Sequence, residues 1–203
     1  MPYKRVYLIG LTGNIACGKS TVLAMLKERG AAVIDADQVT RQVQQPGEPV
    51  YRQIVEAFGD AILVEPGGPI DRQRLGAIVF SDPQALRRLE QIVHPAVHAR
   101  ILAWLDDAAN HARVAVIDAV KLLEAGWKQV CDAVWVVTCT PDQQLRRLIE
   151  TRGMSESEAR MRIAAQPPQE SRVAQADVVI DNSGALAATR AQVDAAWARI
   201  PIE

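Results

Sequence analysis

The chain has 203 residues, a length that suits one large domain with a sizeable buried core. Hydrophobic residues make up 49% of it and charged residues 23%, which is typical of a folded globular protein and excludes a disordered chain. The formal net charge is −1, which argues against nucleic acid or an anionic membrane surface as a partner.

Two further features of the composition bear on where the protein works. No apolar run approaches the roughly 18 residues that a membrane span requires, so we expect no membrane partner. The three cysteines, Cys17, Cys131 and Cys139, have neither disulfide-like nor metal-binding spacing. We therefore expect a reduced, cytoplasmic location. The oligomeric state cannot be read from the sequence, and we expect a monomer or a weak homo-oligomer.

A glycine-bounded loop lies between the first predicted strand and the first predicted helix. Residues 13–20 fit the phosphate-binding pattern G-x-x-x-x-G-K-[ST]. The glycines let successive backbone N–H groups face phosphate oxygens, and a helix N-terminus favours the same anion. Lys19 can reach the β- and γ-phosphates, and the Ser20 hydroxyl can ligate Mg²⁺. The residues that we expect to hold a nucleotide here are Gly13, Asn14, Ile15, Ala16, Cys17, Gly18, Lys19, Ser20 and Thr21.

A second short apolar run, residues 32–35, follows the first predicted helix. Strand, helix and strand within about 30 residues make a βαβ unit, which predicts a parallel sheet. The run ends in Asp35 and is followed by Asp37. Because the carboxyl ends of strands line the ligand crevice of an open α/β sheet, we expect a chemical role for at least one of these acids. Either could instead cap the next helix.

Residues 46–105 have the pattern of helices separated by Pro- and Gly-rich turns, which favours a helical lobe for a second substrate. Ser81 and Gln84 predict a helix cap, and a kink or a break is expected at Pro95. His94 and His98 have the spacing of zinc ligands on a helix. No third ligand is evident, so we expect a contact from His94 to an anionic substrate, or a structural role, instead of a metal site.

The third and fourth predicted strands are residues 114–118 and 133–137. The third ends in Asp118, and in phosphate-loop proteins such an acid often holds Mg²⁺ through water. The alternative is a solvated strand end. A capping pattern at Thr140 follows the fourth strand, and a fifth strand is expected at 178–180 before a final amphipathic helix.

After residue 140 we expect a helical hairpin that is rich in arginine, and Ser155 with Glu158 predicts the cap of its second helix. Such a segment beside a phosphate site favours a mobile lid, whose guanidinium groups neutralise the transferring phosphoryl group. The alternative is a solvated face in which interspersed glutamates pair with these arginines. The arginines concerned are Arg146, Arg147, Arg152, Arg160 and Arg162, and the glutamates are Glu150, Glu156 and Glu158.

Taken together, these motifs resemble the dephospho-coenzyme A kinase family over nearly the whole chain. The acidic, His-Pro and late Ala-Asp elements are far more specific than the phosphate loop alone. The similarity rests on Leu11-Thr12-Gly13, Val33-Ile34-Asp35-Ala36-Asp37, Ile70-Asp71-Arg72 with Leu75, Val79-Phe80, Leu89-Glu90-x-Ile92-Val93-His94-Pro95, Gln144 with Arg147, Arg162-Ile163-x-x-Gln166, and Ala176-Asp177-x-x-Ile180-x-Asn182.

The resemblance implies an α/β fold, a three-layer α/β/α P-loop kinase with a five-stranded parallel sheet. It implies a single kinase domain over residues 1–203, with a helical CoA-binding insertion at 38–105 and an arginine-rich lid at 141–168. The implied activity is ATP-dependent phosphorylation of the ribose 3′-hydroxyl of dephospho-CoA, the last step of coenzyme A biosynthesis. The implied partners are therefore ATP, with Mg²⁺ as the cofactor, and dephospho-CoA.

The resemblance also implies roles for individual residues. Asp37 is the expected base, and Lys19 and Arg147 are the other expected catalytic residues. Asn182 is expected in the ATP site near the adenine. On the dephospho-CoA side we expect Thr12, Asp37, Arg72 and His94, and we expect Ser20 and Asp118 near the metal.

The chain departs from the family pattern at the loop and after the third strand. Asn14, Ala16 and Cys17 stand where the family loop is richer in glycine. Asn tolerates a positive φ better than Ala does. Cys17 lies near Lys19 and a helix N-terminus, which predicts a thiol prone to oxidation. After the third strand, residues 121–124 lack the usual Pro and Phe, so Glu124 inherits no role.

Three other functions remain open at this point. A different small-molecule or nucleoside monophosphate kinase could share the scaffold. A regulatory GTPase would need an Asn-Lys-x-Asp motif, whereas the fourth strand leads into Thr138-Cys139-Thr140-Pro141-Asp142. A non-catalytic binding module is disfavoured by the presence of Lys19, Ser20 and Asp37.

Overall fold

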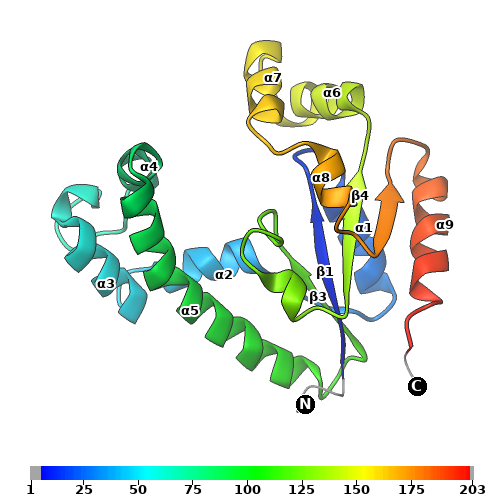
Figure 1. Ribbon diagram of the computed structural model, residues 1–203, viewed down its shortest axis with the longest axis horizontal. Coiled ribbons are helices and arrows are strands. Elements are labelled where there is room, and N and C mark those ends of the chain that lie inside the picture. Colours follow the sequence, from blue (N-terminus) through cyan, green and yellow to red (C-terminus); the bar gives the residue numbers. More distant parts are fainter. Residues whose placement is uncertain (1–5, 202–203) are drawn as a thin grey trace. The chain divides into compact units, whose positions relative to one another are not determined.

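The computed structural model of the protein describes residues 6–201. These residues form two compact units (Figure 1). The first unit contains residues 6–34 together with 106–201, and the second is Asp35–Leu105. The phosphate-loop motif and all the strands except the last residue of β2 belong to the first unit.

The first unit is built on a five-stranded sheet in the order β2-β3-β1-β4-β5. The strands are β1 (Tyr7–Gly13), β2 (Ala32–Asp35), β3 (Val114–Asp118), β4 (Ala133–Thr138) and β5 (Val178–Asp181). The pairs β1–β3, β1–β4 and β4–β5 are parallel. In register, Leu11 lies opposite Asp118, and Gly13 lies opposite Val137. The predicted α/β class and five-stranded parallel sheet are confirmed, and the carboxyl ends of β1, β3 and β4 meet at one edge.

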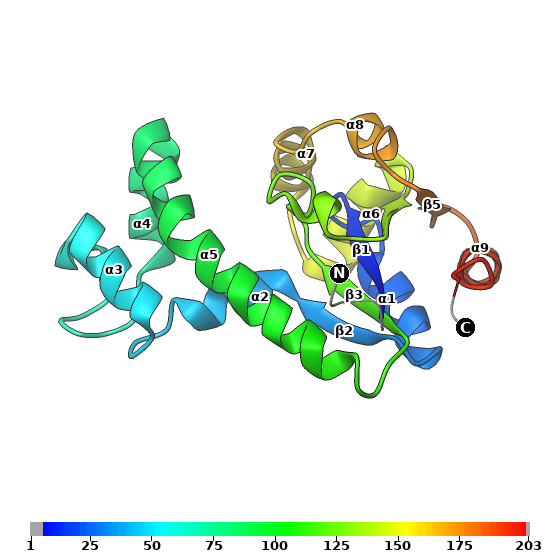
Figure 2. The same ribbon diagram turned by 60° about the horizontal axis from the view of Figure 1, so that its bottom comes forward.

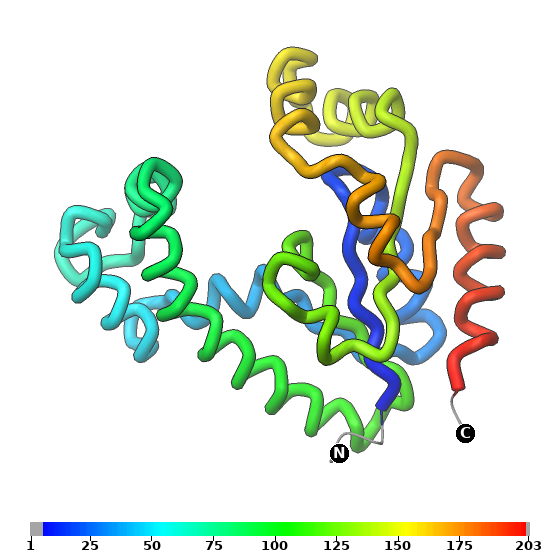
Figure 3. The backbone as a smooth tube through the Cα atoms, viewed as in Figure 1, coloured from blue at the N-terminus to red at the C-terminus, as the bar shows by residue number. Residues whose placement is uncertain are grey.

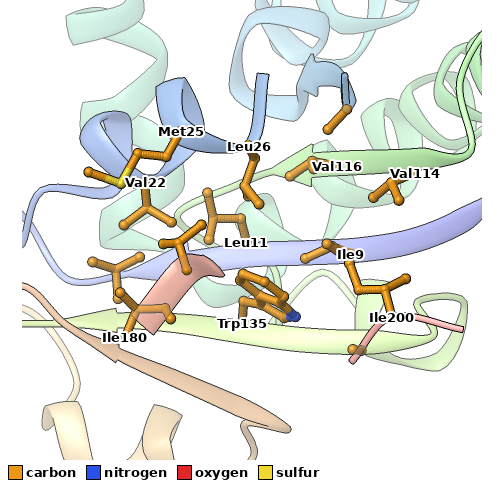
Figure 4. Packing of buried hydrophobic residues seen from close by; sticks show 14 of the residues in the cluster. Ile9, Leu11, Val22, Met25, Leu26, Val114, Val116, Trp135, Ile180 and Ile200 are labelled. Atoms are coloured by element: carbon orange, nitrogen blue, oxygen red, sulfur yellow. The ribbon is translucent and has the colours of Figure 1, made fainter. Parts of the chain in front are cut away.

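One face of this sheet carries the hydrophobic core (Figure 4). Ile9 and Leu11 of β1 lie beside Trp135 of β4, and all three are almost completely buried. Side chains from two helices, α1 (Lys19–Glu28) and α9 (Leu186–Trp197), pack over them. Because successive residues of a strand point to opposite faces, the alternation of Ile9, Gly10 and Leu11 directs only the large side chains into this core.

The opposite face has little room above β1. A β-carbon on Gly10 would lie 2.8 Å from a methyl of Leu122 and 2.9 Å from the Cys131 sulfur. The segment between β3 and β4 therefore passes directly over Gly10, and a glycine in the strand permits that approach. This packing draws the end of β3 and the residues after it close to the strand that feeds the phosphate loop.

The remaining helices of the first unit are α6 (Pro141–Arg152), α7 (Glu156–Ala164) and α8 (Gln169–Val173), with a short 3₁₀ turn at Trp127–Gln129. In Figure 1, α6 and α7 lie side by side, as predicted for a helical hairpin. Their caps are the predicted ones. The Thr140 hydroxyl accepts from the Gln143 N–H at 3.4 Å, and the Ser155 hydroxyl accepts from the Glu158 N–H at 3.2 Å.

The second unit is helical, as its sequence predicts (Figure 2). It contains α2 (Ala36–Val43), α3 (Pro49–Phe58), a 3₁₀ turn at Asp60–Ile62, α4 (Arg72–Ser81) and most of α5 (Pro83–Ala108). The turn between α3 and α4 is closed by an antiparallel bridge from Leu63 to Ile70 and by the Tyr51 hydroxyl, which donates to the Gly68 carbonyl at 2.6 Å.

Two expectations for this unit need correction. Helix α5 is one continuous helix (Figure 3) that contains Pro95, so the break expected there does not occur, because a proline removes a single N–H donor and the neighbouring turns of a 26-residue helix persist. The alternative, a kink at Pro95, stays a prediction. The cap of α5 is Asp82, not Ser81: the Asp82 carboxylate accepts from the Gln84 N–H at 2.7 Å. The Ser81 hydroxyl instead donates to the carbonyls of Ala77 and Ile78 within α4.

In the part of the chain that the structure describes, no helix combines the length and the apolar composition needed to cross a membrane.

Candidate functional site

The phosphate loop borders a pocket of about 730 Å³ within the first unit. All nine residues predicted to hold nucleotide phosphates line this pocket, together with the predicted Arg147, Asn182 and Asp118. The sheet explains the convergence, because β1, β3, β4 and β5 all end at this edge. The remaining lining residues are Val120, Thr151, Arg152, Gln166, Gly184 and Leu186.

Three consecutive carbonyl groups of the loop are held by side chains from outside it. The Gln144 amide donates to the Ile15 carbonyl at 2.9 Å, and Arg147 Nη1 donates to the Ala16 carbonyl at 3.2 Å. The Asn182 amide donates to the Cys17 carbonyl at 2.9 Å. In a planar trans peptide the N–H points opposite to the C=O. Anchoring the carbonyls on one side therefore turns the N–H groups of the following residues the other way.

Asn182 is itself fixed by its neighbours. Its side-chain oxygen accepts from the buried Thr189 hydroxyl at 2.9 Å, and its backbone N–H donates to the Thr138 carbonyl at 2.8 Å. Its own carbonyl accepts from Arg147 Nη2 at 2.8 Å. Both polar ends of the Asn182 side chain are thus engaged inside the protein, and this residue shapes the loop while it also lines the pocket.

The loop contains one strained backbone position. Ala16 has a φ of 57°, and among the described residues it is the only non-glycine with a positive φ. For an alanine this left-handed conformation costs on the order of 1–2 kcal/mol. The unusual backbone that the sequence leads us to expect in this loop therefore falls on Ala16 and not on Asn14.

Lys19 and Asp118 form an ion pair at the end of β3. The register of the sheet explains it, since Asp118 lies opposite Leu11, two residues before the loop begins. Asp118 is only 8% exposed. The interpretation of Asp118 as a solvated strand end is therefore wrong, and its carboxylate belongs to the lining of the pocket.

Cys17 does not have the environment of a reactive thiol. Its side chain is fully buried and belongs to the hydrophobic core. Burial raises the pKa of the Cys17 thiol to about 11, and the neighbouring Cys139 acts in the same direction. Lys19 lowers the pKa, but its effect is smaller than that of burial. The expectation of an oxidation-prone thiol at this position is wrong, because desolvation outweighs the nearby positive charge.

The predicted acceptor-side residues lie in different surroundings. Thr12 is fully buried in β1, and its hydroxyl donates to the Val120 carbonyl at 3.1 Å. In the second unit, Asp37 lies in the first turn of α2, whereas Arg72 on α4 and His94 on α5 are exposed. No group of three acidic, histidine or cysteine side chains within residues 6–201 could hold a metal ion.

The two acids at the carboxyl end of β2 have different roles in the structure. The Asp35 carboxylate accepts from the Gln38 N–H at 2.9 Å and caps α2. The capping function that either acid could have provided thus belongs to Asp35. Asp37 is the acid of the pair that remains available for chemistry.

The arginines of the predicted lid divide into two groups. Arg147 and Arg152 line the pocket. On α7, Arg160 pairs with Glu156 at 2.7 Å and Arg162 pairs with Glu158 at 3.0 Å, and all four side chains are largely exposed. The alternative of a paired, solvated face therefore describes these two arginines, whereas a lid role for the segment stays a prediction.

Sequence reasoning missed Arg172 on α8. Its side chain is almost completely buried next to the phosphate loop, where it contacts Asn14 and Glu124. A single arginine in a short polar helix carries no distinctive pattern. The available signal was indirect: an asparagine stands at position 14, where the family loop is richer in glycine, and its amide needs partners once it is buried.

Comparison with known proteins agrees with this geometry. Residues 7–188 match the dephospho-CoA kinase family. The dephospho-CoA kinase of Symbiobacterium thermophilum is 52% identical over 191 residues, which cover 94% of this chain and 80% of the relative. That of Geobacter sulfurreducens is 47% identical over 195 residues, which cover 95% of this chain and 98% of the relative.

Solved structures give the same picture. TT1252 from Thermus thermophilus superposes with a TM-score of 0.84 at 31% identity, covering 97% of this chain and 99% of its own. The dephospho-CoA kinase from Campylobacter jejuni has a TM-score of 0.68 at 26% identity, with 95% and 96% covered. A shikimate kinase from Bacteroides thetaiotaomicron, at 15% identity and a TM-score of 0.53 over 95% and 97% of the two chains, shares the fold.

Proposed function

This chain belongs to the dephospho-CoA kinase family, and on that premise we propose which of its residues carry out the reaction. The enzyme transfers the γ-phosphoryl group of ATP to the ribose 3′-hydroxyl of dephospho-CoA, which gives CoA and ADP in the final step of coenzyme A biosynthesis. This membership decides against the GTPase and the non-catalytic module that the sequence left open.

The ATP phosphates bind in the loop. The observation that carries this assignment is the anchoring of three consecutive loop carbonyls by Gln144, Arg147 and Asn182, which orients the N–H groups of Ala16 and Gly18. The Cys17 N–H between them donates to the Asn14 carbonyl within the loop. Lys19 leaves Asp118 to contact the β- and γ-phosphates, and Arg147 stabilises the charge of the transferring group. Asn182 lies at the adenine end of the site, as in the family pattern.

Mg²⁺ accompanies ATP, and the residues present fit it. Ser20 is an exposed hydroxyl in the first turn of α1, and Asp118 is a carboxylate, so both are the hard oxygen donors that Mg²⁺ prefers. Mg²⁺ usually takes only one or two protein ligands beside water and substrate phosphates, so a larger protein cage is not required. When bound, the ion neutralises charge on the β- and γ-phosphates. Ser20 and Asp118 would hold it.

Asp37 accepts the proton of the ribose hydroxyl. Its support is its place in the chain, two residues after the last residue of β2, together with the capping of α2 by Asp35, which leaves the Asp37 carboxylate available for chemistry. Thr12, Arg72 and His94 belong to the dephospho-CoA side. Because the Thr12 hydroxyl is already bonded to Val120, its contribution is to shape the site.

Two segments complete the proposal. Residues 38–105 form the CoA-binding insertion within a single kinase domain, and residues 141–168 form the lid, with Arg147 and Arg152 on its inner side. Closure of the lid excludes water, so that ATP is not lost to hydrolysis. The enzyme works in the cytoplasm, where a reducing environment keeps its three cysteines free. It acts as a monomer or a weak homo-oligomer.

The decisive experiment follows ADP release from purified protein with MgATP and dephospho-CoA. We expect ADP to form with dephospho-CoA and not with AMP, shikimate or gluconate as acceptor, and we expect chelation of Mg²⁺ to abolish the reaction. Mass spectrometry of the nuclease-treated product locates the new phosphate on the adenosine ribose. ADP release no faster than in the acceptor-free control would contradict the proposal.

A further inference from the structure

A buried guanidinium lies behind the phosphate loop. Arg172 of α8 is 3% exposed, and its Nε donates to the Asn14 side-chain oxygen at 2.9 Å. Arg172 does not line the nucleotide pocket, whereas Asn14 does. We propose that Arg172 is a positioning residue, which acts through Asn14 to hold the entrance of the phosphate loop in its ATP-binding conformation.

Asn14 makes bonds that a glycine at this position could not make. Its side-chain oxygen accepts from Arg172, and its side-chain nitrogen donates to the Pro167 carbonyl at 3.1 Å. The φ of Asn14 is not positive, so tolerance of a left-handed backbone does not account for the residue. Asn14 is 9% exposed, so both ends of its amide need partners, and these come from Arg172 of α8 and from Pro167, two residues before that helix.

The charge on Arg172 is balanced by Glu124, which lies in the segment between β3 and β4. Its Nη2 donates to one Glu124 oxygen at 3.0 Å, and its Nη1 lies 3.5 Å from the other and 3.5 Å from the Thr12 hydroxyl. A buried cation without a partner is strongly destabilising, whereas here a partly exposed carboxylate neutralises it. Glu124, which inherited no role from the family pattern, thus acts through Arg172.

The residues around Arg172 attach one end of the proposed lid to the loop. The Gln166 side-chain oxygen accepts from the Ile15 N–H at 2.7 Å, and Pro167 accepts from Asn14. From the other end of the lid, Gln144 and Arg147 of α6 bond the carbonyls of Ile15 and Ala16. Loop residues 14–16 are therefore held by both ends of the 141–168 segment, and Arg172 lies in α8, the next helix along the chain. This part of the inference rests on the proposed lid.

The inference predicts a specific kinetic pattern. Because Arg172 touches the loop and not the reacting atoms, loss of its side chain should weaken ATP binding and leave the rate of the bound complex nearly unchanged. Hydrogen bonds to a charged group are stronger than those between neutral groups, so the dissociation constant for ATP should rise by roughly tenfold. A merely structural arginine would lower the melting temperature without changing this constant well below the melting transition.

The test is a double-mutant cycle of Arg172→Met and Asn14→Gly in the full-length protein. ATP binding is measured by calorimetry, and kcat and the KM for ATP are measured at saturating dephospho-CoA. We expect each single variant to raise the dissociation constant and the KM about tenfold with kcat within about twofold, and we expect the double variant to bind no more weakly than Arg172→Met. Arg172→Lys should recover part of the affinity.

Arg190→Met on α9 is the matched control, because Arg190 also pairs with a glutamate, Glu28, but at an exposed site away from the loop. It should bind ATP like the unmodified protein. Unchanged ATP affinity in Asn14→Gly, or additive losses in the double variant, would overturn the inference. If Arg172→Met does not fold, Asn14→Gly and Glu124→Gln decide by the same measurement. The calorimetric measurement needs no acceptor substrate. The inference about Arg172 is therefore tested separately from the proposed phosphorylation of dephospho-CoA.

Discussion

Asn182 donates through its side-chain nitrogen to the Cys17 carbonyl at 2.9 Å, and the same nitrogen fills the space beside the α-carbon of Gly18. A β-carbon on Gly18 would overlap it and would also lie 3.4 Å from Arg147 Nη1. The second glycine of the phosphate-loop motif is thus required twice over, by its φ of 90° and by the side chain behind it.

We predict that Gly18→Ala abolishes measurable ATP binding. The new methyl group must displace Asn182, which releases the Cys17 carbonyl and breaks the bond to Thr189. The positive φ adds a cost of about 1–2 kcal/mol. Calorimetry with ATP and a thermal melt measure the two effects.

Gly30→Ala is the control for backbone strain alone. Gly30 has a φ of 87°, but a β-carbon there would meet nothing within 4 Å. This variant should lose stability by about 1–2 kcal/mol and keep its ATP affinity. If Gly18→Ala also kept its affinity for ATP, the close packing of Asn182 on the loop would not be needed for ATP binding.

Ala16→Gly should stabilise the protein. Relief of the positive φ gains about 1–2 kcal/mol, and the extra freedom of glycine in the unfolded chain offsets about 0.5–1 kcal/mol of it. The expected net gain of roughly 0.5–1 kcal/mol corresponds to a rise in melting temperature of about 1–4 °C for a chain of this size. Differential scanning calorimetry measures it.

The same substitution at an ordinary helical alanine should have the opposite sign. Ala191 is exposed within α9, so Ala191→Gly should cost about 1 kcal/mol. A lower melting temperature for both variants would show that Ala16 is not strained in solution.

Asp37→Asn should lower kcat by a factor of about 10²–10⁴ and leave the dissociation constant for ATP unchanged. The amide keeps the size of the side chain but cannot accept the hydroxyl proton. Asp35→Asn is the matched control, because asparagine caps a helix as well as aspartate does. Rapid-quench measurement of CoA formation separates the two variants, and a kcat for Asp37→Asn close to that of the unmodified enzyme would remove Asp37 from the base role.

Alkaline pH should destabilise the protein through its buried thiols. Burial raises the pKa of Cys17 to about 11 and that of Cys131 to about 12, from an ordinary value of 9.0. The unfolded chain therefore releases these protons first. The stability from Cys17 is complete below pH 9.0 and is lost as the pH rises through about 11.

Urea unfolding at a series of pH values under reducing conditions measures this loss. The Cys17→Ser variant has no thiol to titrate, so its free energy of unfolding should fall less steeply between pH 9 and 11, by up to about 1.4 kcal/mol per pH unit. Equal slopes for the two proteins would mean that the Cys17 thiol is not shielded from water in the folded state.

Local patterns were sufficient for much of the fold and for part of the site. The apolar runs that became β1 to β5 and the caps at Thr140 and Ser155 are signals within a few residues, and all were found at the predicted places. The cap of α5 was misplaced by one residue, because Ser81 and Asp82 are both competent N-caps and only the backbone decides between them. At Pro95, the neighbouring residues in the sequence do not reveal whether the helical turns on either side are stable enough for the helix to continue.

The sequence by itself determined the phosphate loop, its flanking strand and helix, the parallel sheet and the family, because each depends on the order of residues along the chain. The tertiary structure decided what those residues do for one another. Burial made the Cys17 thiol unreactive, and strand register paired Lys19 with Asp118. Hydrogen bonds from residues more than 150 positions away hold the Asn14 side chain and the Cys17 carbonyl in place. Desolvation and long-range hydrogen bonding depend on distances in space, which spacing along the chain does not encode.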